Sequence, residues 1–404
     1  MLWGMHHHDG PLARLRQGHE TLVLDLLRRH GPLTRAGLGT HTGLSRTTLS
    51  DIVGGLVAGG AVVTATPAPA TGRRGRPVET LSLNPAAGQA VGIDFARRAV
   101  HVAAVNVAHE VVGSAGEPHP AGLPWEQRVA IAERLVGGLA GGGIGLGSLT
   151  GIGAGVVGPV GPPGEPDGSP GGTGTVRALL GAAFGVPVLV DNNTRLAALA
   201  ESVWGSATGS RDVLYLRLSH GVGGGLVVGG ALHGGAYGLS GELGHITVDP
   251  AGAPCDCGGR GCLETVASIG AVLEAHRAAG GRAADVAEFT AAATAGEEAA
   301  LGVLRTVGGH VGTVLAAVCN AVGPGVVVVG GELAGAGALL LTPVEEALAA
   351  HVLPLARSRL DLRRAALGEY GGALGGIALV LQASPLLSHY PHRTPTRPDG
   401  EDTP

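Results

Sequence analysis

The chain has 404 residues and a net charge of −5, with 27 basic residues against 32 acidic ones. Glycine contributes 74 residues, whereas aromatic residues make up only 2%. The glycines follow no strict Gly-X-Y period, which excludes a collagen helix. Abundant Val, Leu, Ala and Ile and a mean hydropathy of +0.30 argue against simple disorder. We therefore expect two or three globular domains with small-residue cores and many glycine turns.

No apolar run reaches the roughly 20 residues that span a bilayer. The start, MLWGMHHHDG, lacks the basic and apolar segments of a signal peptide. We interpret His6 to His8 as a tag remnant or a solvated tail, with metal binding as the alternative. Four cysteines without an export signal favour a metal or free thiols over disulfides. These features predict a cytoplasmic protein with no membrane partner.

The charge is divided unevenly along the chain. Residues 1–84 contain nine Arg and five acidic residues, whereas the remainder contains 18 Arg and 27 acidic residues, and there is no lysine. A basic N-terminal segment on an acidic body is typical of a nucleic-acid-binding head. Drift of local composition is the alternative explanation.

The N-terminal segment has the pattern of a helix-turn-helix. Apolar spacing predicts a first helix over 19–29, which Gly31 and Pro32 end. Thr34 is a good N-cap for a short second helix, and Ser45 for a third. A glycine turn at 42–43 separates these two helices, an arrangement typical of DNA-binding heads. Residues 61–66 and 79–83 alternate like a two-stranded ribbon. Four residues of the third helix are expected on one apolar face: Leu49, Ile52, Val53 and Leu56.

Short hydroxyl side chains and a guanidinium begin the third helix, where such groups reach base edges and phosphates in the major groove. The ribbon's tip, TPAPATGRRGRPV, presents arginines in a thin loop that suits a narrow minor groove. The stretch LSRTTLSDIV resembles the winged helix-turn-helix of bacterial repressors. The alternative is a three-helix packing module with an unrelated basic linker. The expected DNA contacts are Arg35, Ser45, Arg46, Thr47, Thr48, Ser50, Arg73, Arg74 and Arg76.

After residue 85 the pattern changes to alternating strands and helices, which indicates an α/β body. A helix is expected over 194–204, and residues 140–185 give no clear pattern apart from one strand. The expected strands are 90–95, 99–107, 151–157, 186–190, 212–218, 226–228 and 326–329.

One imidazole and three thiols lie within eighteen residues in GHITVDPAGAPCDCGGRGCLE. The residues are His245, Cys255, Cys257 and Cys262. Zinc binds such a set of three cysteines and one histidine tetrahedrally, and four protein ligands leave no open position, so we expect a structural zinc ion. Unpaired loop cysteines are the alternative. Cys319 lies in the apolar stretch VLAAVCNAV and is predicted to be a buried hydrophobe.

The stretch from Ser219 to Ser268, beginning SHGVGGGLVVGG and containing GELGH, resembles the signature of the ROK family of repressors, open reading frames and kinases. The resemblance extends over about residues 88–383 and includes GIDF, GPVGPPGEPDG, LVDNNTRLAALAES and VVVVGGELAGAG. It implies a two-lobed, actin-like α/β body of the hexokinase type, with a sugar in the cleft. We expect a flexible N-terminus (1–15), a winged helix-turn-helix (16–84), a ROK sugar-binding domain (85–385) and a disordered tail (386–404).

The resemblance also implies roles for individual residues. Glu242 and His245 of the Glu-x-Gly-His motif would contact sugar hydroxyls, as would Glu264 and Asn192. Carboxylates and amides suit sugars because they offer directional, often paired hydrogen bonds. Zinc would hold His245 and Glu264 in fixed orientation. Asn193 could also hydrogen-bond the sugar.

Two departures from the family pattern argue against a kinase. Family kinases use the Asp of an Asn-Asp pair as general base, and Asn193 stands at that position with an amide that cannot accept a proton. Their first phosphate loop reads Asp-x-Gly-Gly-Thr, where this chain has Asp94-Phe95-Ala96-Arg97-Arg98. We therefore expect no catalytic residue. The segment 169–172, Ser-Pro-Gly-Gly, also lacks an Asn that often contacts the sugar.

The sequence predicts a sugar-responsive transcriptional regulator of carbohydrate-metabolism genes. A homodimer, with a tetramer as the alternative, would bind double-stranded operator DNA, and a sugar or sugar phosphate would release it. Activation or co-repression by the sugar stays open. Two other readings also stay open: a ROK-type ATP-dependent sugar kinase with a DNA-binding head, and a ligand-blind DNA-binding protein whose body only dimerises.

Overall fold

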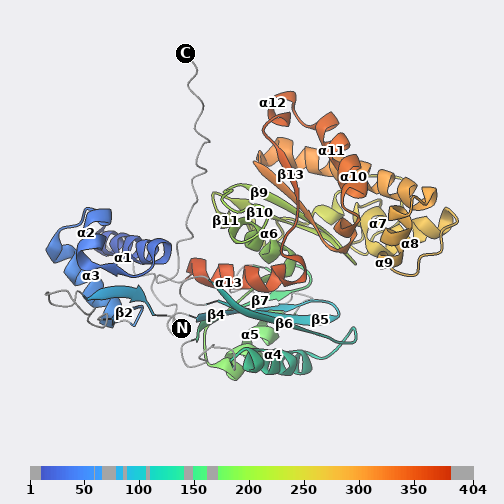
Figure 1. Ribbon diagram of the computed structural model, residues 1–404. Helices are drawn as coiled ribbons and strands as arrows, with labels where there is room; N and C mark the ends of the chain where they lie inside the picture. The colour runs from blue at the N-terminus through green and yellow to red at the C-terminus, as the bar shows by residue number, and fades with distance from the viewer. Residues whose placement is uncertain are drawn as a thin grey trace, which may run out of the picture.

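The structure is a computed structural model that describes residues 11–58, 60–65, 79–84, 89–105, 110–140, 149–161 and 172–383. It consists of a small N-terminal head and a body that contains two five-stranded sheets (Figure 1). Several expectations fall outside the described residues: the histidine tract at 6–8, the wing tip with Arg73, Arg74 and Arg76, the segment 169–171 and the tail after 385.

In its described residues, the head has three helices and a three-stranded antiparallel sheet of order β1-β3-β2. In its core, the expected apolar face of the third helix packs against residues of the first two helices, among them Val23 and Leu38. The predicted helix-turn-helix and ribbon are therefore present. The elements are α1 (Pro11–His30), β1 (Leu33–Thr34), α2 (Arg35–Thr42), α3 (Arg46–Ala58), β2 (Val62–Ala65) and β3 (Thr80–Leu83).

Both predicted helix caps of the head are formed. Thr34 Oγ1 accepts a hydrogen bond from Gly37 N at 3.0 Å, and Ser45 Oγ accepts one from Thr48 N at 3.2 Å. The first helix is longer than the sequence pattern predicted. It begins at Pro11, because proline is well suited to the first helical position, where no backbone donor is needed.

The first lobe has a sheet of order β6-β5-β4-β7-β8. Strands β4, β5 and β6 form an antiparallel meander, whereas β7 and β8 are parallel to β4. The sequence pattern did not predict β6, α4 or α5, and β8 continues to Asn192 rather than ending at 190. The elements are β4 (Gln89–Phe95), β5 (Ala99–Val105), β6 (Val111–Pro118), α4 (Trp125–Ala140), β7 (Leu149–Val156), α5 (Thr173–Phe184) and β8 (Val188–Asn192).

The second lobe repeats this topology, with order β11-β10-β9-β12-β13. The first three strands again form an antiparallel meander, and β12 and β13 are parallel to β9. Strand β10 begins at Val222, four residues before the expected start. The elements are β9 (Val213–Leu218), β10 (Val222–Val228), β11 (Ala231–Leu232), η2 (Leu243–His245), α7 (Glu264–Ala267), α8 (Ile269–Ala278), α9 (Val286–Thr294), α10 (Glu298–Val322), β12 (Val326–Gly330), η3 (Glu332–Ala336), α11 (Ala338–His351), α12 (Pro354–Arg357) and β13 (Asp361–Arg364).

Two helices lie between the sheets and join the lobes: α6 (Asn193–Val203) and α13 (Gly371–Ala383), the latter preceded by η4 (Gly368–Tyr370). Glycine allows α13 to approach its neighbours closely. A Cβ atom on Gly92 of β4 would lie 1.7 Å from the carbonyl oxygen of Ala373, and one on Gly375 would lie 1.9 Å from that of Leu196. Part of the glycine excess therefore serves close packing between the lobes rather than turns.

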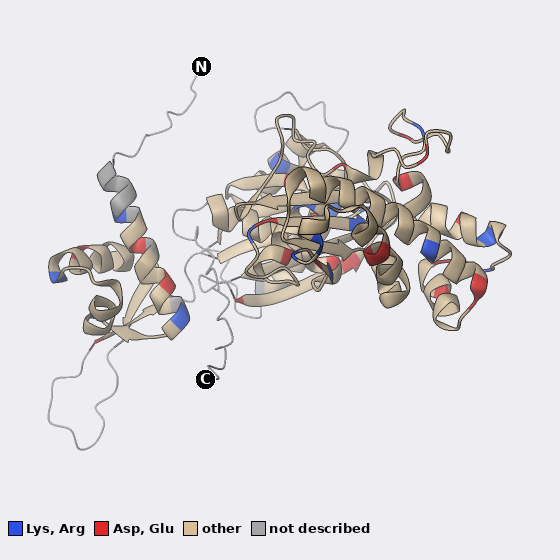
Figure 2. Ribbon diagram, turned by 90° about the horizontal axis from the view of Figure 1, so that it is seen from above, with Lys and Arg blue, Asp and Glu red and all other residues tan. Residues whose placement is uncertain are grey.

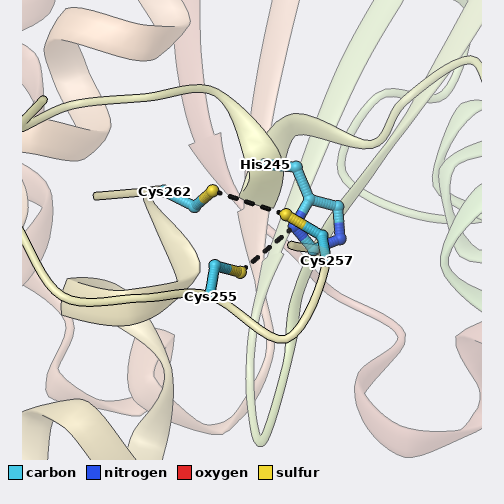
Figure 3. Close-up of side chains that lie close together, drawn as sticks. All are labelled: His245, Cys255, Cys257 and Cys262. Carbon is cyan, nitrogen blue, oxygen red and sulfur yellow. Dashed lines mark hydrogen bonds between the residues drawn. The ribbon is translucent and has the colours of Figure 1, made fainter. Parts of the chain in front are cut away.

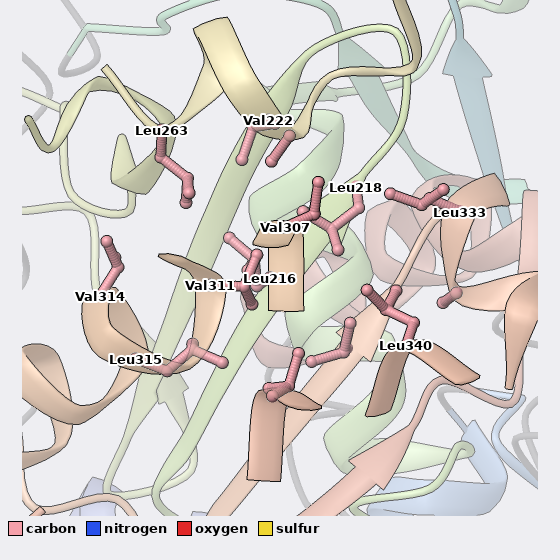
Figure 4. Close-up of a cluster of buried hydrophobic side chains, with 14 of the residues drawn as sticks. Leu216, Leu218, Val222, Leu263, Val307, Val311, Val314, Leu315, Leu333 and Leu340 are labelled. Carbon is pink, nitrogen blue, oxygen red and sulfur yellow. The ribbon is translucent and has the colours of Figure 1, made fainter. Parts of the chain in front are cut away.

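Helices α10 and α11 cover the outer face of the second sheet. Leu216 and Leu218 of β9 pack against Val307 and Val311 of α10 and against Leu340 of α11 (Figure 4). Among the described helices, α10 alone is long and apolar enough to cross a membrane, and half of its apolar window is buried in this core. Cys319 lies in α10 and is buried, as predicted.

Candidate metal and sugar site

The four predicted zinc ligands lie together in the second lobe (Figure 3). His245 ends the short helix η2, Cys255 and Cys257 lie in the following loop, and Cys262 lies just before α7. His245 Nδ1 is 3.7 Å from Cys255 Sγ, and Cys257 Sγ is 3.7 Å from Cys262 Sγ. All four ligand atoms lie within 4.8 Å of one another.

The donor set and its spacing fit a tetrahedral zinc ion. With Zn–S bonds of about 2.3 Å, two sulfurs of a tetrahedron lie about 3.8 Å apart. A backbone hydrogen bond from Cys255 N to Gly259 O, 2.9 Å, folds the loop back on itself. Burial and the neighbouring sulfurs raise the pKa of the Cys262 thiol to about 12. The Cys262 thiol therefore resists ionisation unless a cation shares the site, whereas a backbone hydrogen bond from Gly259 lowers the pKa of the Cys257 thiol.

His245 connects this cluster to the sugar-binding residues that the family resemblance implies. Its Nδ1 faces Cys255, while its Nε2 lies 3.9 Å from a carboxylate oxygen of Glu242. Glu264 lies in the first turn of α7, and its Oε2 accepts a hydrogen bond from Val222 N at 2.8 Å. Glu242 and His245 are both about one-third exposed, so a ligand can reach them.

Asn192 and Asn193 come from the first lobe's last strand and the start of α6. Asn192 is the N-cap of α6: its Oδ1 accepts from Thr194 N and Arg195 N, and its Nδ2 donates to Gly158 O at 2.8 Å. A sugar contact by Asn192 would therefore have to share atoms that already bind the backbone.

Asn193 is buried, and its Nδ2 donates to Oδ1 of Asp94 at 3.0 Å. Asp94 lies near the end of β4 in the first lobe and is 1% exposed. Burial raises the pKa of Asp94, while the charge of Arg217 and the hydrogen bond from Asn193 lower it. The amide of Asn193, the residue that the family resemblance would place at a kinase's general-base position, is thus committed to a buried carboxyl group.

The expected DNA-contacting residues of the head have different surroundings. Ser45 and Thr48 share a hydrogen bond of 2.9 Å at the N-cap of α3, and Arg35 forms a 3.4 Å ion pair with Glu79. Within the described part of the chain, Arg46, Thr47 and Ser50 are exposed and make no side-chain hydrogen bond or ion pair. Figure 2 shows that charges of both signs are interspersed on the head.

Two charged residues at this site, Asp191 and Arg195, were not predicted from the sequence. They form an ion pair at the start of α6, where Arg195 is 4% exposed. An arginine in the first turn of a helix is unfavourable for the helix dipole. The place of Arg195 in the sequence, early in a predicted helix, could therefore have indicated that it has a specific partner.

The duplicated sheet, the two helices between the lobes and the cluster of one histidine and three cysteines define an actin-like, two-lobed protein of the hexokinase type, preceded by a winged-helix head. The sequence profile of the ROK family matches residues 171–383, more than half of the chain, and the chain belongs to the ROK family. The profile of the MarR family matches residues 16–74, which cover most of the head.

Relatives include both an enzyme and regulators. The chain is 36% identical over 212 residues to the glucokinase of Halalkalibacterium halodurans, covering 49% of this chain and 64% of the relative. It is 32% identical over 209 residues to the DNA-binding transcriptional repressor Mlc of Escherichia coli, covering 49% and 51%. It is 24% identical over 373 residues to the xylose repressor of Bacillus spizizenii, covering 91% and 96%. The matches thus span only part of the first two relatives.

Among solved structures, a ROK family transcriptional regulator described as a homologue of Escherichia coli Mlc is similar over nearly the whole chain. The TM-score is 0.76 at 26% identity, and the match covers 93% of this chain and 98% of the other. A match of that extent includes the head as well as the two lobes.

Proposed function

We propose that this protein is a sugar-responsive, DNA-binding transcriptional regulator of the cytoplasm. It represses carbohydrate-metabolism genes and is released by a sugar or sugar phosphate. One observation carries this proposal: a single chain contains both a winged head and a ROK body. The third helix of the head presents polar side chains without partners among the described residues, and the body has polar groups that could bind a sugar. The full-length similarity to a ROK regulator supports it.

In this proposal the head binds operator DNA in the major groove through α3. Arg46, Thr47 and Ser50 contact bases or phosphates directly, while Ser45, Thr48 and Arg35 support them. The wing arginines Arg73, Arg74 and Arg76 lie outside the described residues and are proposed to enter the adjacent minor groove. A homodimer, or a tetramer built from two dimers, places two heads on an inverted repeat.

The body binds the sugar in the cleft. The carboxylates of Glu242 and Glu264 accept hydrogen bonds from its hydroxyls, and His245 forms a further hydrogen bond. Asn192 and Asn193 lie on the first-lobe side of the sugar. A structural zinc ion held by His245, Cys255, Cys257 and Cys262 would fix the imidazole so that Nε2 faces the sugar and Glu242. Sugar binding stabilises one arrangement of the lobes, and operator affinity changes with it.

Phosphoryl transfer is not part of the proposed function. Asn193 cannot accept the proton of a sugar hydroxyl, and its amide already donates to Asp94. The arginines at 97 and 98 stand where a phosphate loop needs close backbone approach. The similarity to a glucokinase favours the kinase as the second candidate. ATP-dependent phosphorylation of a hexose or acetylated hexosamine by the purified protein would establish it.

Replacing Arg46 by alanine tests the DNA-binding face. We expect operator affinity to fall by about 5- to 150-fold, since one base or phosphate contact contributes roughly 1–3 kcal/mol. Arg29→Ala is the matched control, because it removes the same charge from an exposed position on α1. Fluorescence anisotropy on operator DNA at two salt concentrations measures both. Equal losses in the two variants would show that only net charge matters, and would contradict the assignment of α3.

A further inference from the structure

Arg195 joins the two lobes at the edge of the candidate sugar site. From the first turn of α6, its Nη2 donates to Val160 O at 3.2 Å, and its Nη1 donates to Gly238 O. Val160 lies in the loop after β7 of the first lobe, and Gly238 lies in the second-lobe loop between β11 and η2. One guanidinium group therefore binds carbonyl oxygens from both lobes.

The second-lobe loop is held at its base and at one point of its tip. At the base, Gly224 N donates to Gly241 O at 2.7 Å, next to Glu242. Between residues 234 and 240 only Gly238 is buried, whereas Tyr237 is 75% exposed and Leu239 is 52% exposed. The tip of this otherwise exposed loop is thus fixed where Arg195 contacts it.

The contact between the two loops is tight enough to require glycine. Gly238 has φ of +70°, and a Cβ atom there would lie 2.1 Å from Val160 O. Any side chain at 238 would therefore push the loops apart. Gly235, in the same loop, has the same φ of +70°, but its Cβ would meet only Ser240 of its own loop, at 3.4 Å. The two glycines differ in whether they face the other lobe.

The charge of Arg195 is neutralised by Asp191 of β8, whose Oδ1 accepts from Arg195 Nε at 2.7 Å. Burial raises the pKa of Asp191, and the adjacent guanidinium opposes that rise. Because Asp191 compensates its charge, Arg195 is not free to attract an anionic ligand. Its planar donors instead bind fixed acceptors in three segments, which a lysine ammonium on one flexible stem would not span.

We propose that Arg195 is a positioning residue that fastens the 234–241 loop of the second lobe to the 158–161 loop of the first. This contact, which we call the Arg195 latch, holds the loop that leads into Glu242 and keeps the two lobes together at that point. Opening the latch means breaking the hydrogen bonds to Val160 O and Gly238 O. The latch also sets how readily a sugar reaches Glu242, a role that rests on the proposed function.

Hydrogen–deuterium exchange of the full-length protein tests the latch without any need for DNA or a known sugar. The double variant Arg195→Met/Asp191→Asn removes the contacts without leaving a buried charge. Gly238→Ala separates the loops while keeping Arg195. In both, we expect exchange of peptides covering 234–241 to rise by about tenfold or more, because the tip loses its buried attachment, and exchange of peptides covering 158–161 to rise with it. Gly235→Ala, with equal backbone strain, leaves the 158–161 peptides unchanged.

The inference is overturned if exchange in 234–241 is unchanged in Arg195→Met/Asp191→Asn and Gly238→Ala. It is also overturned if Gly235→Ala raises exchange at 158–161 as much as Gly238→Ala does. Peptides from β12 and α10 report on global folding in the same experiment, and unchanged exchange there separates latch opening from unfolding. Neither exchange measurement requires operator DNA or a sugar. Failure of the proposed regulatory function can therefore be distinguished from failure of the latch.

Discussion

Cys262→Ala is expected to abolish metal binding and to destabilise the second lobe, whereas Cys319→Ala leaves the metal in place. Both changes remove one buried sulfur, so they lose similar packing. Of these two cysteines, only Cys262 has its Sγ near the other three candidate metal ligands. Loss of a structural zinc ion removes binding free energy that is coupled to folding. We expect Cys262→Ala to cost at least about 2 kcal/mol more than Cys319→Ala.

Metal content by mass spectrometry and urea unfolding measure this difference. The wild type and Cys319→Ala should carry about one zinc ion per chain, which is the stoichiometry of a single site with four protein ligands. Cys262→Ala should carry none. Since His245 would lose its fixed orientation, sugar-dependent release from DNA should fail in the same variant. Equal zinc content in the two variants would contradict the assignment.

Asn193→Asp is expected to destabilise the protein rather than to restore a kinase. The new carboxyl group would lie within hydrogen-bond distance of Asp94, which is 1% exposed. Two carboxylates that close cannot both ionise, so at least one pKa rises. A raised carboxyl pKa stabilises the fold most at low pH, and that contribution is lost as pH rises through the raised value. The cost should therefore be small near pH 4, close to the ordinary pKa of an unfolded Asp, and reach about 2–4 kcal/mol near pH 8.

Urea unfolding at the two pH values measures this cost, and the exchanged pair supplies the control. Asp94→Asn/Asn193→Asp keeps one carboxyl group, one amide and the hydrogen bond between them, so we expect much of the lost stability to return. A cost that does not depend on pH would refute the proposed carboxyl pair. ATP-dependent sugar phosphorylation by Asn193→Asp would instead support the kinase candidate.

The head and the cysteine cluster could be predicted from the sequence because their signals are local. Thr34 and Ser45 are N-cap residues followed by apolar helical faces, and the caps form as expected. Three cysteines and a histidine within one glycine-rich loop can meet without any knowledge of the rest of the fold. The repeated α/β body was implied by resemblance, and the duplicated sheet order agrees with it.

The contacts between the lobes could not be predicted because they depend on tertiary packing. Helix α13 begins GGALGG, which has poor helix propensity, and it forms because its glycines fit closely against β4, β7 and α6. The pairing of Asn193 with Asp94 joins residues 99 positions apart. The partners of Arg195 lie in loops of both lobes, so no sequence spacing indicates them.

Sequencing of the genomic DNA fragments that the purified full-length protein retains tests operator binding and the sugar response in one experiment. Binding should be measured at two salt concentrations, with and without a panel of hexoses, pentoses and acetylated amino sugars. We expect retention of a small set of fragments with inverted repeats, weakened by salt and abolished by one sugar class. No salt-sensitive retention of any fragment would contradict DNA binding, and retention that no sugar alters would contradict the sugar response.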